Sequence, residues 1–424
     1  MRFDKQQILI LICMFSAAFV LRVLLFSLQG HQNDLDTFAY WFNTAAASGP
    51  SSFYNTVGWC DYPPFNIYLF WGFGSLVQVL NLFGSSIVYI IKLVPNIFDM
   101  LIAGVIYFFV QKSLGFKLGA LAAAFYLFNP AVIFNAAIWG QFDAIYTLFL
   151  LVSLILMLKG KPELSALSFA VSILTKPQAI ALLPLFVFIV FKKNGVRRFL
   201  SSAAIFIATI FAVILPMQWN NPVTFFYDIY FGAYGGYEYT SVNAFNLWGL
   251  SGLWVPDGNL FIVGWVLFAI FSVFTLYVLY KRWNKSNQTM LLIFFAAFMF
   301  CFAFFMLPTR IHERYLFPAI SFLALMFPFA KKTRLFYAVI TATFLTNIAY
   351  ILHWFNLYLT EGYHNAPNLS GDPIVVVVSI INVIMFLYGL TLLWHELKGT
   401  TVFKLEPLTI TGNKQKKGVA SNET

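Results

Sequence analysis

The chain has 424 residues, of which 60% are apolar, 20% aromatic and only 10% charged, and its formal net charge is +10. This composition excludes an ordinary soluble domain, because one core could not hide so much apolar surface from water. The three cysteines predict neither a disulfide framework nor a clustered metal site.

The first apolar run, residues 8–28, has the length of a membrane-spanning helix. Asp4 lies beside its basic flank, Arg22 interrupts it and no clean cleavage site follows, so we expect a retained span; a secretory signal is the alternative. Because Arg22 lies one or two turns from the helix end, we expect its side chain to extend to the membrane interface.

Further apolar runs of about 20 residues predict an all-α, polytopic membrane protein with about twelve crossings. The expected spans are 8–28, 88–111, 117–136, 143–158, 163–175, 178–192, 197–216, 260–280, 289–307, 315–330, 334–352 and 373–395. With both termini in the cytoplasm, 21 of the 26 Lys and Arg residues fall on that side. The net positive charge therefore indicates topology and not nucleic-acid binding.

Two apolar segments break the simple pattern. Residues 65–83 look long enough to cross, but a crossing there would reverse the charge bias, so we expect a helix that lies in or re-enters the outer face. Residues 164–191 have basic loops at both ends, so they must go out and return, with the turn at 175–178 below the membrane surface. Irregular backbone at that depth is expected only where it lines a cavity or is buried in protein.

Five basic residues fall outside the cytoplasmic segments: Arg22, Lys92, Lys176, Arg310 and Arg314. Lys92 has Asp99 two helical turns later, so we expect an intramembrane ion pair between them. The last three lie where topology gives no reason for cations, and this predicts an anionic ligand.

Acidic residues gather on the same expected outer side: Asp34, Asp36, Asp61, Asp143 and Glu313. Unpaired carboxylates near an interface are candidates for general-base catalysis. The alternative for Asp34 or Asp36 is a helix cap, and Gln141 and Asp143 have the same alternative.

Three motifs at these positions carry a resemblance: "DLDTFAYW" at 34–41, "DYPP" at 61–64 and "HER" at 312–314. Together they resemble the multispan glycosyltransferases of the C-type fold, which use polyprenyl-phosphate sugars. Similar members are the dolichyl-phosphate-glucose glucosyltransferases and the prokaryotic relatives of the second GPI mannosyltransferase. Residues 140–143 read Gly-Gln-Phe-Asp where those glucosyltransferases carry Gly-His-Phe-Gln, so mannose and glucose both stay open.

The resemblance implies a catalytic base in the first external loop, and the spacing to Trp41 assigns this role to Asp34, with Asp36 as the reserve candidate. It also implies that Lys176, Gln178 and His312 line the donor phosphate site.

The function we expect is inverting transfer of a hexose from a polyprenyl-phosphate sugar to a lipid-linked or cell-surface glycan, on the extracytoplasmic side of a prokaryotic cell membrane. Arg310 and Arg314, four residues apart on a helix-like face, would stabilise the charge on the leaving phosphate, and Glu313 would orient them. The remaining candidate substrate-binding residues are Asp61, Gln141 and Asp143.

A transporter or flippase of lipid-linked saccharides is the alternative, because it would also bury ionisable residues. An acyltransferase or a polymerase-ligase of surface glycans is a further rival. We expect no cofactor; a divalent metal is a less favoured option, because the basic cluster can neutralise one phosphate.

The chain divides into a membrane domain, 1–398, whose first external loop covers about 29–87, and a polar tail, 399–424. The tail is expected to be disordered and attracted to anionic lipid.

Overall fold

The computed structural model describes residues 4–82, 84–283, 286–360 and 369–408. Within these residues the chain folds into helices joined by loops, and the only β-type pairing is three isolated bridges. The helices that are long and apolar enough to cross a membrane are α1 (Lys5–Leu25), α5 (Ile87–Leu114), η3 with α10 (Pro177–Ile214), α13 (Leu260–Arg282), α14 (Ser286–Met306), α16 (Lys331–Thr360) and α17 (Pro373–Leu397). The chain is therefore a polytopic helical membrane protein, as the sequence predicts.

Each of the twelve expected spans coincides with helical residues. By length and composition, however, seven helices of the described chain qualify, or eight if α6 (Phe116–Leu127) and the bent continuation Pro130–Trp139 are one span. Gly195, at φ +75°, interrupts the long α10 (Leu183–Ile214), so this segment consists of two helices. The number of crossings remains a prediction.

The shorter apolar helices lie inside the bundle. They are α8 (Asp143–Leu158), α9 (Pro162–Thr175) and α15 (Phe317–Met326), and all ten residues of α15 are buried. The central α14 is also largely enclosed, with 89% of its apolar window buried. Helices too short to span the hydrocarbon alone are thus largely covered by protein, although Leu164 and Leu167 near the start of α9 are exposed. Between α9 and η3 (Pro177–Leu182), Lys176 is extended, so the backbone break expected at 175–178 is present.

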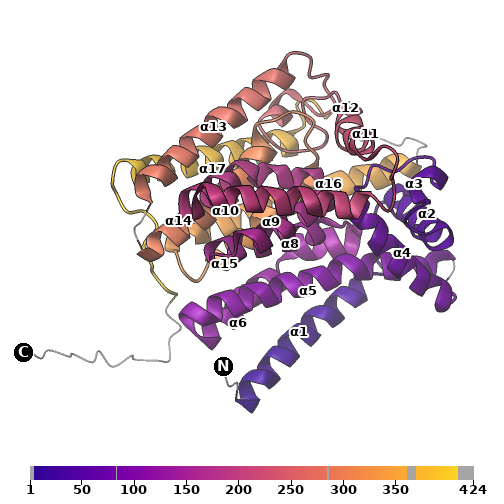
Figure 1. Ribbon diagram of the computed structural model, residues 1–424, viewed down its shortest axis with the longest axis horizontal. Coiled ribbons are helices and arrows are strands. Elements are labelled where there is room, and N and C mark those ends of the chain that lie inside the picture. Colours follow the sequence, from indigo (N-terminus) through magenta and orange to yellow (C-terminus); the bar gives the residue numbers. More distant parts are fainter. Residues whose placement is uncertain (1–3, 83, 284–285, 361–368, 409–424) are drawn as a thin grey trace, which may run out of the picture.

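A group of short helices covers one end of the bundle: α2 (Gln32–Ser48), α3 (Phe53–Thr56), α4 (Pro64–Val79), η1 (Gly84–Ser86), α11 (Pro222–Tyr227), η4 (Asp228–Gly232) and α12 (Ala233–Gly235). Figure 1 shows α2, α3, α4, α11 and α12 together on the right, away from both termini. Helix α4 has only 16 residues and packs against α2. This agrees with the expectation that segment 65–83 does not cross the membrane.

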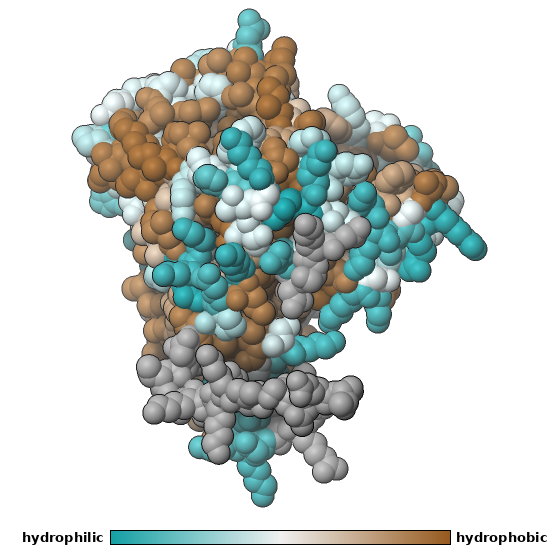
Figure 2. All heavy atoms as spheres, turned by 90° about the vertical axis from the view of Figure 1, so that its left-hand side faces the viewer, coloured by the Kyte–Doolittle hydropathy of each residue, from teal (hydrophilic) through white to brown (hydrophobic). Residues whose placement is uncertain are grey.

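Basic residues gather at the end that carries the termini. Figure 2 shows this end, where hydrophilic side chains are bordered by apolar flanks. Exposed basic residues lie at the helix ends that meet here: Lys112, Lys117, Lys159, Lys161, Lys192, Lys193, Arg197, Arg198, Lys281, Lys331 and Lys332. The contrast between the two ends matches the charge bias that the sequence predicts.

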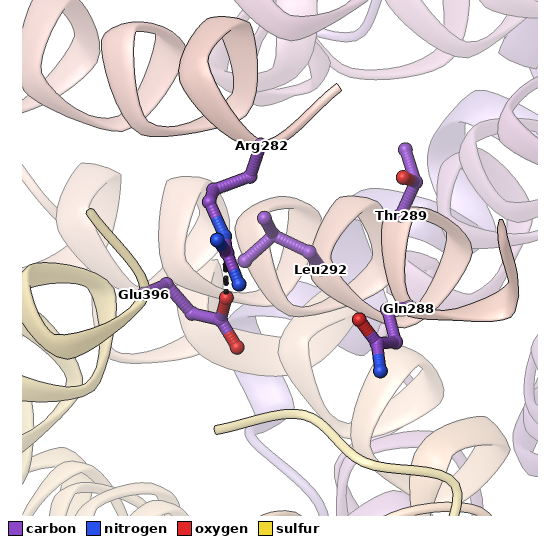
Figure 3. Close-up of a pocket in the computed structure, with 5 residues that line it drawn as sticks. All are labelled: Arg282, Gln288, Thr289, Leu292 and Glu396. Carbon is purple, nitrogen blue, oxygen red and sulfur yellow. Dashed lines mark hydrogen bonds and ion pairs between the residues drawn. The ribbon is translucent and has the colours of Figure 1, made fainter. Parts of the chain in front are cut away.

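The first part of the C-terminal tail packs against the bundle. Figure 3 shows Glu396 of α17 facing Arg282 of α13, and the two form an ion pair with an N–O distance of 3.2 Å. The Glu396 carboxylate also accepts hydrogen bonds from the amides of Val402 and Phe403, and Phe403 is buried. The tail was expected to be polar and disordered from 399 onward, but residues 400–408 contact the helix bundle. Residues 409–424 lie outside the described part of the chain.

Two expectations about buried cations are wrong. Arg22 does not reach the interface: its side chain is fully buried, and its guanidinium donates to the Ala18 carbonyl and faces Asp99. Lys92 does not pair with Asp99. Its Nζ donates to the carbonyls of Phe26 and Leu28 just beyond α1, while Asp99 accepts a hydrogen bond from Tyr126.

Candidate functional site

Asp34 lies in the first turn of α2, directly after the tight connection from α1. In this connection Gly30 approaches the backbone of Ile138 and Trp139 so closely that a Cβ atom would lie 2.8 Å from the Ile138 carbonyl oxygen. A larger residue would push the turn away. The close approach brings the start of α2 against the segment that precedes α8.

That segment orients Asp34. Residues Phe134–Trp139 form a π-helix, η2, and Gly140 then turns the chain at φ +87°. The turn directs Trp139 Nε1 and Gln141 Nε2 at the same carboxylate oxygen, Asp34 Oδ2, over 2.9 and 2.6 Å. Since π-helical turns often occur at functional sites, the π-helix η2 indicates that this part of the fold is a candidate functional site.

Asp34 is ionised at neutral pH. Burial alone would raise its pKa, but the interaction with His31, the positive charge of Arg314 and the Trp139 hydrogen bond together lower the pKa to about 2. His31 Nδ1 lies 3.0 Å from Asp34 Oδ1, and the Asp34 side chain remains 28% exposed. The carboxylate is therefore oriented, charged and accessible.

Arg314 approaches Asp34 from η6 (Glu313–Leu316). Its Nη1 lies 3.6 Å from Asp34 Oδ2 and 3.3 Å from Glu313 Oε1, both longer than a strong charge-assisted hydrogen bond. The guanidinium stacks over Trp139, and its Nε is buried without a hydrogen-bond partner. Burial raises the pKa of Glu313 against the opposing pull of Arg314. Arg314 thus makes only weak contacts to the two carboxylates, and its Nε–H remains available as a donor.

Lys176 is neutralised by a carboxylate of its own. Its Nζ lies 2.7 Å from Asp143 Oδ1, and both side chains are buried. Asn135 donates to the other oxygen of Asp143, and the Lys176 ammonium also lies over the ring of Tyr62 at 5.5 Å. The alternative that Asp143 and Gln141 only cap a helix is wrong, because Asp143 pairs with Lys176 and Gln141 donates to Asp34.

Asp61 borders the same group of charges. Burial raises the pKa of Asp61, opposed by the attraction of Lys176 and Arg314 and reinforced by the repulsion of Asp34. We call Asp34, Asp61, Asp143, Lys176, His312, Glu313 and Arg314 the polar cluster.

His312 enters the polar cluster from the loop before η6. Its backbone bridges to Val242 and Asn243, and its ring packs edge-on to Tyr237 with 4.8 Å between ring centres. Burial, together with the positive charges of Arg314 and Lys176, lowers the pKa of His312 to about 3. The imidazole is therefore neutral at physiological pH and adds no positive charge for a phosphate.

Arg310 is not part of the polar cluster. Its Nε lies 2.8 Å from Asp257 Oδ2, its Nη2 lies 3.4 Å from Asp257 Oδ1, and its guanidinium stacks on Phe261. Arg310 has a φ of +64°, and η6 begins only at Glu313, so the expected helix-like face shared with Arg314 does not exist. Arg310 holds its loop to the start of α13.

Asp36 and Gln178 are not members of the polar cluster. Asp36 is exposed and accepts a hydrogen bond from Gln32, one turn earlier on α2. Gln178 follows the break at Lys176 and interacts with the side chain of Tyr315. Across the described residues, no group of three or more His, Cys, Asp and Glu side chains is placed to hold a metal ion.

Four residues of the site were not among those singled out from the sequence: His31, Tyr62, Trp139 and Tyr237. Two had a local indication. His31 precedes Asp34 by three residues on one helix face, and Trp139 lies two residues before Gln141. Tyr237 comes from a distant loop, and nothing in its sequence neighbourhood distinguishes it from the other 20 tyrosines.

The polar cluster thus combines an ionised, accessible carboxylate with an arginine that has a spare donor, and it can take a proton and bind an anion. Residues 44–240, from the end of α2, after Asp34, to the loop before the His312 contacts, match the model of a family described as GPI transamidase subunit PIG-U. The match includes Asp61, Asp143 and Lys176 but ends before Arg314. It does not single out the dolichyl-phosphate-glucose or prokaryotic mannosyl enzymes. No curated protein matches the chain. Over this stretch, the chain is similar to a membrane family connected with GPI.

Proposed function

We propose that the protein transfers a hexose, mannose or glucose, from a polyprenyl-phosphate sugar to a hydroxyl group of a lipid-linked or cell-surface glycan. The reaction takes place on the extracytoplasmic side of the membrane, with Asp34 as the general base. The observation that carries the proposal is the placement of Asp34. Its carboxylate is charged, accessible, oriented by Trp139 and Gln141, and next to Arg314.

The chemistry is a single displacement. Asp34 takes the proton of the acceptor hydroxyl as the oxygen of that hydroxyl forms a bond to the anomeric carbon of the donor sugar. The bond from that carbon to the phosphate oxygen breaks, and the polyprenyl phosphate leaves with the electron pair. One displacement inverts the anomeric configuration. Since phosphate is a good leaving group, one carboxylate suffices and no acid is needed. The proposal invokes no metal or cofactor.

Arg314 is the cation best suited to the leaving phosphate. Lys176 and Arg310 are already held at 2.7 and 2.8 Å by Asp143 and Asp257, whereas the contacts of Arg314 are longer and its Nε is unpartnered. A phosphate that binds Arg314 draws positive charge away from Asp34 and adds a negative charge nearby. Both effects raise the Asp34 pKa from about 2, so donor binding strengthens the base.

The variants Asp34→Asn and Asp36→Asn test the assignment, because they make the same substitution two residues apart on one helix. Full-length protein in detergent is incubated with radiolabelled polyprenyl-phosphate hexose and a membrane lipid extract. We expect Asp34→Asn to lower the transfer rate by about 100- to 10,000-fold, the usual contribution of a general base. Asp36→Asn is expected to retain transfer, since Asp36 contacts only Gln32 in the described structure. Full activity of Asp34→Asn would reject Asp34 as the base.

A second candidate function is binding of a GPI-like glycolipid without turnover, as a subunit of a larger enzyme. The family match over residues 44–240 favours it, since that family is described as a subunit of GPI transamidase. The same assay separates the two functions. A purified chain that binds glycolipid but transfers no label from several polyprenyl-phosphate hexoses would support the subunit.

A further inference from the structure

A cavity of 450 Å³ lies beside the polar cluster, and this volume is within the range of about 300–1,000 Å³ typical of small-molecule sites. Its walls come from the loop between α3 and α4 and from the segment 228–237. Trp59, 62% exposed, and the exposed Asp228 lie at its mouth, and Asp61 and Tyr237 lie deeper.

The lining excludes an anion and suits a sugar. Two carboxylates, Asp61 and Asp228, face the space, and no lysine or arginine is among the described residues that line it. A phosphate would be repelled here, whereas carboxylates accept hydrogen bonds from hydroxyl groups. Trp59 and Tyr237 supply flat apolar faces of the kind that pack against the C–H face of a sugar ring. Gly232 and Gly236 add no side chain, and a Cβ at Gly232 would meet nothing within 4 Å.

The cavity joins the polar cluster through Asp61, which belongs to both, and through Tyr237, which packs against a member of the cluster. Asp61 interacts electrostatically with Lys176, Arg314 and Asp34, and Tyr237 packs against His312. A molecule in the cavity therefore extends toward the proposed base, while the cation suited to phosphate lies on the cluster side.

We propose that this cavity binds the uncharged sugar residues of the acceptor glycan, with Trp59 as the stacking surface and Asp61 and Asp228 as acceptors for sugar hydroxyl groups. The proposal rests on the proposed function, because it divides the substrates of that reaction between two places. The donor phosphate binds at Arg314 and the acceptor sugars bind in the cavity.

Saturation-transfer NMR on the full chain in detergent tests binding without any turnover. The probes are neutral hexose disaccharides and, as the anionic comparison, inorganic phosphate. We expect the wild-type protein to transfer saturation to a disaccharide. In Trp59→Ala, the disaccharide should bind roughly tenfold more weakly, since an aromatic face is lost. Trp59→Phe should restore most of the binding, and Asp228→Asn should weaken it. Trp71→Ala is the matched control, because Trp71 is 45% exposed on α4 and does not line the cavity.

The outcomes distinguish the two proposals. If transfer proceeds and neither Trp59→Ala nor Asp228→Asn changes the KM for the acceptor, the cavity is not the acceptor site and the proposed function survives. If disaccharides bind in a Trp59-dependent way but no donor supports transfer, the proposed function fails and the cavity remains a glycan site. Phosphate that competes with the disaccharide for this cavity would overturn the division of substrates.

Discussion

At the scale of single residues, the cations of the site differ in how firmly they are held. A buried charge is costly without a partner, and a partner that satisfies it also makes it less available to a ligand. Lys176 and Arg310 have short contacts to carboxylates, at 2.7 and 2.8 Å. Arg314 has only longer contacts to two carboxylates and an unpartnered Nε, so it is the least tightly held of the three and the one best able to bind a phosphate.

The substitutions Arg314→Lys and Arg310→Lys separate these roles, because each keeps the charge and removes the guanidinium fork. We expect Arg314→Lys to weaken binding of polyprenyl phosphate by roughly tenfold or more, since a lysine cannot reproduce the planar donor set. Arg310→Lys should leave this binding unchanged but lower the thermal midpoint in detergent, because the two contacts to Asp257 and the stacking on Phe261 are lost. Equal losses of binding in both variants would indicate that Arg310 also binds the phosphate.

Sequence spacing ranked neighbouring residues correctly in one case and wrongly in another. The motif spacing favoured Asp34 over Asp36, and the structure places only Asp34 in the polar cluster. Helical spacing favoured Lys92 with Asp99, yet Lys92 binds two carbonyls just beyond α1 and Asp99 binds Tyr126 of α6. Periodicity indicates which residues share a face, but it cannot rank them against partners brought close by tertiary packing.

At the scale of helices, α1 is attached to the bundle by very few side chains. Only Ala18 and Arg22 of α1 are buried. Partly buried apolar residues such as Met14 and Phe15 also pack against the core. A polar attachment comes from Lys92 of α5, whose Nζ donates to the Phe26 and Leu28 carbonyls over 2.9 and 2.7 Å. A cation at this position satisfies carbonyls that a helix C-terminus leaves unpaired and interacts favourably with the helix dipole.

Replacing Lys92 with methionine should therefore detach the end of α1. The variant loses two charge-assisted hydrogen bonds, each worth about 1.5–3 kcal/mol, and leaves the carbonyls unpaired in an apolar setting. We expect a lower thermal midpoint in detergent, measured by the loss of monomeric protein on heating. Lys112→Met is the control, because Lys112 is exposed near the end of the same helix. If the two variants unfold at the same temperature, Lys92 does not attach α1.

Helices were more predictable than the breaks within them. Apolar runs predicted helical residues in each of the twelve expected spans, because length and hydropathy are local properties of the chain. The extended residue at Lys176 was also foreseen from segment length. The π-helix before Gly140 was not, since it depends on the approach of Gly30 and α2, which are about 100 residues earlier. The site depends on this unpredicted break, because it directs Trp139 and Gln141 at Asp34.

At the scale of the whole molecule, the two ends of the bundle differ in charge. One end carries the termini and the exposed basic residues (Figure 2), and the other carries α2 to α4 (Figure 1). The cavity and the polar cluster include residues of α2 and of the loop between α3 and α4 and therefore belong to this second end. The distribution of lysine and arginine predicts that the basic end faces the cytoplasm. The polar cluster would then face the side on which polyprenyl-phosphate sugars, and not nucleotide sugars, are the available donors.

Cysteine labelling tests this orientation. The three native cysteines are replaced by alanine, and Asp36→Cys and Lys112→Cys are introduced separately at exposed positions near opposite ends. In intact cells, a membrane-impermeant maleimide should label residue 36 directly and residue 112 only after permeabilisation, because basic loops stay in the cytoplasm. The reverse pattern would place Asp34 and Arg314 among nucleotide sugars. The anion at Arg314 would then be better sought in a diphosphate, and the Asp34→Asn assay would have to be repeated with nucleotide-sugar donors.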